Sequence, residues 1–210
     1  NNSLTLVSGS GTTTVSGAVT EMNALTVQAS GATGTVTFEQ NLTATSLTTA
    51  AANYALSLQG GSTTITDADG VTFTNTGALT LGNDNGDTLV FTGGMTAAAP
   101  SVVNVRGTLR AAGAAQISVG DSDTGVAVSG TTLIGGVSTG DITVAAVTLA
   151  DGAGVTIGGN TSSNISVASI AGTDSGAVSD VTFNTAGTVT VTGAVGTDIG
   201  TLTLTRGEGI

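Results

Sequence analysis

The chain has 210 residues, of which 39% are apolar and only 8% charged, and its net charge is −11. Arg106, Arg110 and Arg206 are its only cations, so phosphate backbones and anionic lipid surfaces would be repelled and we expect no nucleic-acid partner. No apolar run approaches about 20 residues, so we expect no membrane insertion by a helix.

Short alternating runs recur from one end of the chain to the other. Each places two apolar side chains on one face of an extended strand and a Thr or Ser on the other. The runs are Leu4–Leu6, Leu25–Val27, Val36–Phe38, Val71–Phe73, Leu79–Leu81, Ile117–Val119, Val155–Ile157, Val189–Val191 and Leu202–Leu204. No segment has a sustained 3.6-residue period, so we expect an all-β chain without helices. The only proline, Pro100, falls in a stretch (95–101) that we expect to be a loop.

A repeat of 23 residues superimposes Ile142 on Ile165 and Val144 on Val167. A fixed period of this size is typical of a solenoid. One coil would hold strands at 142–144, 147–149 and 155–157, and the next at 165–167, around 170 and at 178–183. A further coil, with the period slipping to 24, would hold strands at 189–191, 195–199 and 202–204. We therefore predict a parallel β-solenoid with about 23 residues and three short strands per coil, forming a single domain over residues 1–210 in about nine coils.

A second, longer-range echo connects Val71-Thr72-Phe73 with Val181-Thr182-Phe183, and Val36-Thr37-Phe38 is a third copy. The two ends carry no evident capping segment, either at 1–9 or at 206–210. Because an uncapped coil presents unpaired backbone groups, we expect the rod to continue in further residues or to stack end to end with copies of itself. The first residue is not Met, so we also expect the numbering to begin after processing or within a longer polypeptide.

Three acidic turns are the candidate metal sites, because calcium takes several oxygen ligands from such loops. They comprise Asp67 with Asp69, Asp84 with Asp87, and Asp121 with Asp123. The segment 81–90 partly matches the Gly/Asp nonapeptide of calcium-binding β-rolls, although only once. The alternative is that Asp serves as an ordinary turn residue. Calcium is thus the one candidate cofactor.

Thr-x-Thr pairs suggest a second kind of site, because regular Thr ranks on a flat solenoid face order water in ice-binding proteins. The pairs stand at 12–14, 35–37, 43–45, 72–74, 190–192 and 201–205. An ice-binding face requires the motif on the same side of every coil, and the segment 142–178 lacks it.

The chain lacks several of the side chains on which common catalytic mechanisms depend. His and Cys are absent, which excludes a His-based triad, a thiol nucleophile and an imidazole or thiolate metal site. The four phenylalanines lie in strand positions typical of a core. We therefore expect that the protein is not an enzyme and that it has no catalytic residue. The absence of Cys, with this composition, favours a secreted protein that is extracellular or at the cell surface.

The phrases Gly187-Thr188-Val189-Thr190-Val191-Thr192-Gly193-Ala194-Val195-Gly196 and Gly77-Ala78-Leu79-Thr80-Leu81-Gly82 resemble the β-strand-repeat regions of giant bacterial surface proteins, the filamentous-haemagglutinin-like adhesins and related fibre-forming proteins. The resemblance covers nearly the whole chain and rests on recurring phrases of this kind, not on one invariant motif. It implies a right-handed parallel β-helix, secretion, and a role in adhesion, matrix or surface fibres. Glycans or neighbouring cell surfaces would then be partners, and no functional residue is transferred.

These observations favour a structural component of an extracellular bacterial fibre, surface layer or matrix that associates with itself through its uncapped ends. A stalk segment of a large cell-surface adhesin is the first alternative. An ice-binding solenoid is the second.

Overall fold

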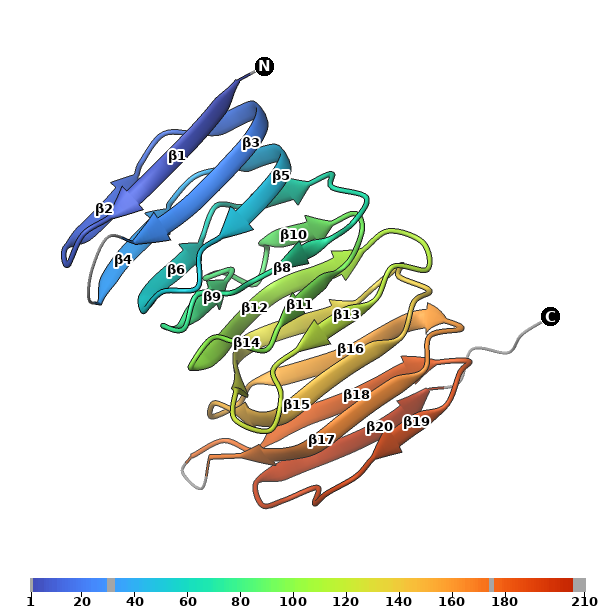
Figure 1. Ribbon diagram of the computed structural model, residues 1–210. Helices are drawn as coiled ribbons and strands as arrows, with labels where there is room; N and C mark the ends of the chain where they lie inside the picture. Colours follow the sequence, from blue (N-terminus) through green and yellow to red (C-terminus); the bar gives the residue numbers. More distant parts are fainter. Residues whose placement is uncertain (1, 30–32, 174–175, 206–210) are drawn as a thin grey trace.

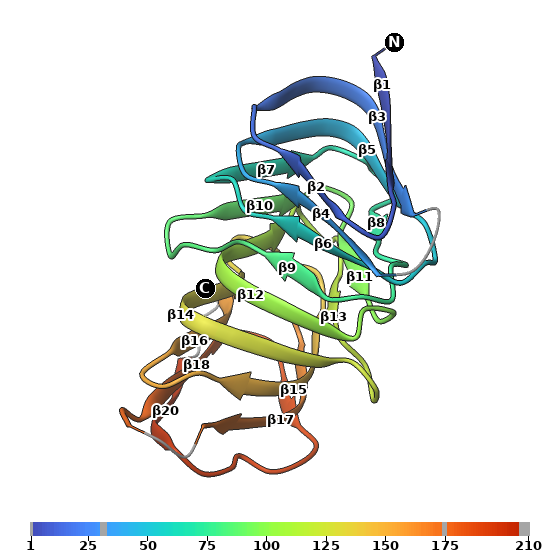
Figure 2. The same cartoon turned by 90° about the vertical axis from the view of Figure 1, so that its left-hand side faces the viewer.

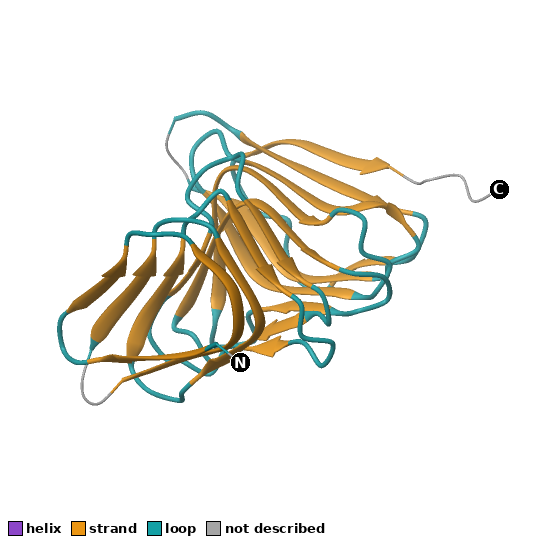
Figure 3. Cartoon of the chain, turned by 90° about the horizontal axis from the view of Figure 1, so that it is seen from above, coloured by secondary structure: helices purple, strands orange, loops and turns teal. Residues whose placement is uncertain are grey.

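The alternating runs form strands that wind around a common axis in a parallel β-solenoid. The computed structural model describes residues 2–29, 33–173 and 176–205. Within these residues there are strands and loops but no helix (Figure 3). The chain makes about nine coils of roughly 23 residues, stacked so that β1 (Ser3–Ser8) and β20 (Ile199–Thr205) lie at opposite ends (Figure 1). The predicted fold class, strand content and coil length are confirmed.

Every strand pairing is parallel, and the pairings divide the solenoid into three faces, which we name A, B and C in the order in which a coil visits them (Figure 2). Face A consists of β1, the second part of β3 (Val19–Ala29), the second part of β5 (Leu42–Thr49), β8 (Val71–Thr72), β11 (Met95–Ala97), β13 (Ile117–Val119), the first parts of β15 (Ile142–Leu149) and β17 (Ile165–Gly172), and β19 (Val189–Val191).

Faces B and C are built in the same way. Face B consists of β2 (Thr12–Val15), β4 (Gly34–Phe38), β6 (Tyr54–Leu58), β9 (Leu79–Leu81), the first parts of β12 (Val102–Ala111) and β14 (Gly125–Gly135), and the second parts of β15 and β17. Face C consists of the first parts of β3 and β5, β7 (Ser62–Ile65), β10 (Thr88–Phe91), the second parts of β12 and β14, β16 (Gly154–Thr161), β18 (Ser179–Thr185) and β20.

The 23-residue repeat is a true structural register. Ile142 pairs with Ile165, and Val144 with Val167, as neighbours on face A. The expected strands at 142–144 and 147–149 are one strand, β15, that bends from face A to face B. The expected strand at 195–199 is reduced to an isolated bridge between Ile170 and Val195, and β20 begins only at Ile199. Part of the stretch 95–101, expected to be a loop, is strand β11.

The longer-range echo does not mark a structural register. Val36–Phe38 lies on face B, Val71–Phe73 starts on face A, and Val181–Phe183 lies on face C. What the three copies share is an inward phenylalanine, since the side chains of Phe38, Phe73 and Phe183 are all buried. The echo therefore reports the alternation within a strand, which is the same on every face.

The core is a set of apolar columns that run along the axis. On face A, for example, Ile117, Ile142 and Ile165 are stacked in register, and each is at most 1% exposed. Each such side chain contributes roughly 1.5–3 kcal/mol by leaving water. Near the middle of the rod, the rings of Phe73 and Phe91 meet edge to face with centroids 5.6 Å apart. Stacking like on like fills the interior without a second structural layer.

Buried hydroxyl groups satisfy the backbone where the chain turns. At the edge between faces C and A, Ser138 Oγ donates to the carbonyl oxygen of Ala111, and Thr161 Oγ1 donates to that of Ser138. Thr185 Oγ1 donates in turn to the Thr161 carbonyl, at 2.9 Å. The hydroxyls thus join successive coils at the edges, where the regular strand ladder is interrupted.

We expect Leu149→Ala to lower the free energy of unfolding by about 2–5 kcal/mol, because Leu149 is 0% exposed and its removal leaves a cavity in the stacked core. The matched control is Thr148→Ala, since Thr148 is the neighbouring residue of β15 and points outward. Urea unfolding followed by circular dichroism measures both. Equal effects of the two substitutions would contradict the assignment of the inner and outer faces.

Candidate functional site

The three acidic turns lie on three different edges of the solenoid. Asp67 and Asp69 stand between β7 and β8, where face C meets face A. Asp84 and Asp87 stand between β9 and β10, where face B meets face C, and Asp121 and Asp123 stand between β13 and β14, where face A meets face B. Among residues 2–29, 33–173 and 176–205, no group of three or more His, Cys, Asp or Glu side chains is close enough to hold a metal ion. The structure therefore brings each predicted pair together but not the pairs with one another.

The carboxylates of these turns accept hydrogen bonds from the turn backbone. Asp121 Oδ1 accepts from the amides of Asp123 and Thr124, both at 2.9 Å. Asp87 is only 4% exposed, and its Oδ2 accepts from the amides of Asn83 and Asp84 at 2.7 and 2.9 Å. These bonds are those of Asp as a turn residue. Calcium binding at a single pair stays a prediction.

Arginine and asparagine reinforce one of these turns. Arg106 Nε donates to Asn85 Oδ1 at 2.9 Å, and one of its terminal nitrogens donates to the carbonyl of Asn83. Asn85 Oδ1 also accepts from the amide of Thr131, so the turn is held to the following coils. One of the few cations of the chain is thus used to fix an edge.

The Thr-x-Thr pairs do not form one surface. Pairs 12–14 and 35–37 lie on face B, 43–45 and 201–205 on face C, and 72–74 and 190–192 on face A. The copies of the motif are therefore divided among the three faces, and they do not build two parallel rows of Thr on any one face.

A single rank of outward hydroxyl residues does run the whole length of face A. It contains one Thr or Ser from each coil, directly after the first inward apolar residue, and we name it the hydroxyl rank. Its members are Thr5, Thr26, Thr48, Thr72, Thr96, Ser118, Thr143, Ser166 and Thr190. All are exposed or half-buried. The rank continues through the segment 142–178, where the Thr-x-Thr motif is missing.

Sequence reasoning missed this rank because the coils differ in length. Leu25 follows its face A neighbour Leu4 by 21 residues, whereas Ile142 follows Ile117 by 25. Ser also replaces Thr in two coils. The signal that could have found it is the position after each inward face A residue, but that position is defined only once the coils are aligned.

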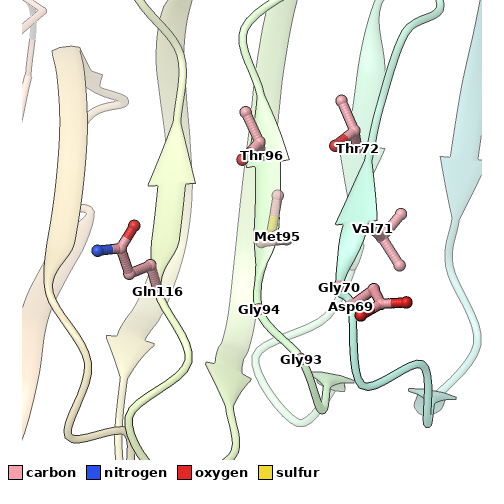
Figure 4. Close-up of a pocket in the computed structure, with 9 residues that line it drawn as sticks. All are labelled: Asp69, Gly70, Val71, Thr72, Gly93, Gly94, Met95, Thr96 and Gln116. Atoms are coloured by element: carbon pink, nitrogen blue, oxygen red, sulfur yellow. The ribbon is translucent and has the colours of Figure 1, made fainter.

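Two shallow hollows lie along the same face. One, of about 260 Å³, is lined by Thr72, Thr96, Asp69 and Gln116 around the glycines that precede β8 and β11 (Figure 4). The other includes Thr143, Ser166 and Thr190. Both linings are mainly polar, so face A presents hydroxyl, amide and carboxylate groups in rows.

A second row of polar side chains borders the hydroxyl rank in the C-terminal coils. Asn164 Nδ2 donates to Asp141 Oδ1 at 3.0 Å, and Asn164 Oδ1 accepts from the amide of Thr188 at 3.1 Å. These bonds run along the axis and hold neighbouring coils at a constant separation. In these three coils, side-chain hydrogen bonds therefore add to the strand pairing beside the hydroxyl rank.

The first and last described coils form the other notable surfaces. In the last coil, inward-type residues are uncovered: Val195 is 41% exposed, Leu202 52% and Leu204 53%. In the first coil, Leu4 and Leu6 are half-buried. The stretch 1–9, whose sequence has no evident cap, contains strand β1. The stretch 206–210, with Arg206, lies outside the described residues. Among the described residues, both end coils thus carry strands paired on one side and partly exposed apolar side chains.

No family model, no curated protein and no solved structure matches the chain. In the part of the chain that the structure describes, no helix is long and apolar enough to cross a membrane.

We expect Asp121→Ala to lower the stability by about 1 kcal/mol, because two backbone amides lose their acceptor. Asp123→Ala is the control that removes the same charge from the same turn. Melting temperatures are measured with calcium and with a chelator. A turn role predicts the same loss in both conditions, whereas a calcium-dependent stabilisation that Asp121→Ala abolishes would support the cation site.

Proposed function

We propose that this chain is a structural component of an extracellular bacterial fibre, surface layer or matrix, extended by stacking of one end coil on another. The observation that carries the proposal is the state of the last coil, where Val195, Leu202 and Leu204 are each at least 41% exposed although they occupy inward-type positions. Side chains at such positions are covered in every interior coil, and a further coil would cover them here.

Strand edges point to the same conclusion. An edge strand carries unpaired amide and carbonyl groups, which form a template for another strand. Joining the last coil of one copy to the first coil of another is a heterologous contact, and such contacts give open filaments when they do not close into a ring. The rod, with its ends on opposite sides, is suited to open growth (Figure 1).

Composition supports a structural role over a catalytic one. The chain has no His and no Cys, and aromatic residues make up 2% of it. The imidazole and thiol groups on which many catalytic mechanisms depend are therefore absent, and the aromatic side chains that could stack on sugars are buried in the core. We propose that the protein is not an enzyme and that it is secreted, as its resemblance to bacterial fibre-forming proteins implies.

We expect the purified chain to form long filaments in electron micrographs and Leu204→Asp to abolish them, because a carboxylate would be buried at the joint. Val137→Asp is the matched control, since Val137 is 64% exposed in the turn before β15 and away from both ends. Both variants should keep the β-sheet circular dichroism spectrum.

Stable monodisperse monomers of the unmodified chain would contradict filament assembly by this segment. That outcome would favour the alternative of an adhesin stalk, in which the same coils are covered by neighbouring segments of one long polypeptide. Binding to glycans or to cell surfaces would then belong to other parts of that polypeptide.

The hydroxyl rank favours ice binding as a second candidate function. Its members recur once per coil on face A, where paired strands lie about 4.8 Å apart, and they are directly paired at every step except that from Thr48 to Thr72. Regular, fixed hydroxyl groups could hold an ordered layer of water along face A.

We expect thermal hysteresis from the chain if face A binds ice, and loss of that activity in Thr143→Tyr, whose ring would displace the ordered water. Thr148→Tyr is the control, because Thr148 is also an exposed residue of β15 but lies on face B. An unmodified chain without thermal hysteresis, or an equal loss in both variants, would contradict the ice-binding function.

A further inference from the structure

We infer that the joint between two copies is head to tail and in register, with Thr190 of one copy beside Thr5 of the next. This inference rests on the proposed function and specifies its partner, a second copy of this chain.

The direction of the joint follows from the strand pairing. All pairings within the solenoid are parallel, so each coil presents the same row of amides and carbonyls to the coil that follows it. The outer edge of the last described coil therefore matches the outer edge of the first described coil of another copy. Two copies that met through the same end would have to pair antiparallel, which occurs nowhere between the described strands.

The register of the joint follows from the sequence of the two face A strands. Val189-Thr190-Val191 and Leu4-Thr5-Leu6 have the same alternation. Leu4 begins one run of aligned inward residues on face A and Val189 ends the other. Between the two runs, Thr49 Oγ1 donates to the Thr72 carbonyl and joins β5 to β8. Stacking them directly places Val189 on Leu4 and Val191 on Leu6. A shift of one residue would turn Thr toward the interior and apolar side chains toward water.

Face C agrees with this register. Leu204 is paired with Phe183 in the ladder that begins with the pair Val19 and Leu42, so Leu204 and Val19 are the last and first members of one inward column. Direct stacking covers the 53% exposed Leu204 with Val19, which is itself half-buried.

Charge does not oppose the joint. Among the described residues of the two end coils the acidic side chains are Glu21 and Asp198. Glu21 lies where face C passes to face A, whereas Asp198 lies just before face C, so the two carboxylates occupy different edges. Stacking in register brings no pair of like charges together, and it extends the hydroxyl rank from Thr190 to Thr5 as one line.

The absence of Cys from the chain allows a direct test with the double variant T5C/T190C. Neighbouring parallel strands are about 4.8 Å apart, which lies within the Cα separation that a disulfide accepts. Position 5 lies in β1 and position 190 in β19, and these strands stand near opposite ends of the rod (Figure 1). Any disulfide between the two positions therefore joins two molecules. We expect mild oxidation to give a ladder of covalent multimers on a non-reducing denaturing gel, with peptide mapping that links position 5 to position 190.

The control is T5C/T203C, because Thr203 is exposed in the same end coil but lies on face C. It should give few cross-links under the same conditions. Filaments that form normally but cross-link as well through T5C/T203C would overturn the register. Rapid dimerisation of T5C alone would overturn the head-to-tail direction. The absence of both filaments and multimers would overturn the proposed function itself, because then no joint forms.

Discussion

The structure depends on one constraint: after each turn, every strand must pair in parallel with the equivalent strand of the preceding coil, one strand spacing along the axis. Because pairing is parallel and in register, a residue such as Ile142 contacts the same kind of residue above and below it, Ile117 and Ile165. Inward positions of the interior coils are therefore mostly apolar, with a few buried Thr such as Thr63 between Leu42 and Leu89. Nothing requires the coils to have equal length. The edges absorb the difference in length, and their buried hydroxyls satisfy the backbone there.

Several features of the edges follow from this division of roles. Gly107 has a φ of 81° where β12 bends from face B to face C, and a Cβ there would lie 2.5 Å from the carbonyl oxygen of Asp87. Only glycine fits such a close approach between coils. The Asp turns serve the same edges through their carboxylate acceptors. Gly and Asp, which are poor strand formers, thus serve at the edges, where a strand ends or, as at Gly107, bends from one face to the next.

The sequence allowed the fold to be predicted because inward positions repeat in kind, as Ile142 and Ile165 do. It did not allow the site to be predicted to the same extent. The hydroxyl rank depends on aligning coils whose lengths vary, and the conspicuous Thr-x-Thr and Val-Thr-Phe patterns describe single strands, which look alike on every face. Similarly, the acidic pairs are visible as turns, but their separation onto three edges follows from the winding, which no single pair reveals.

Outward positions distinguish the three faces in a way that the core does not. On face B the position equivalent to the hydroxyl rank includes Asn104, Ala127 and Ala171, and face C includes Leu133 beside Thr156. A solenoid therefore tolerates varied side chains on its outer surface. The persistence of Thr or Ser on face A, from Thr5 to Thr190, is not required for folding, so it is the property of the outer surface that a function, whether lateral contact or ordered water, would use. Because coils at both ends carry it, stacking copies in register would produce one uninterrupted line of hydroxyl groups along a fibre.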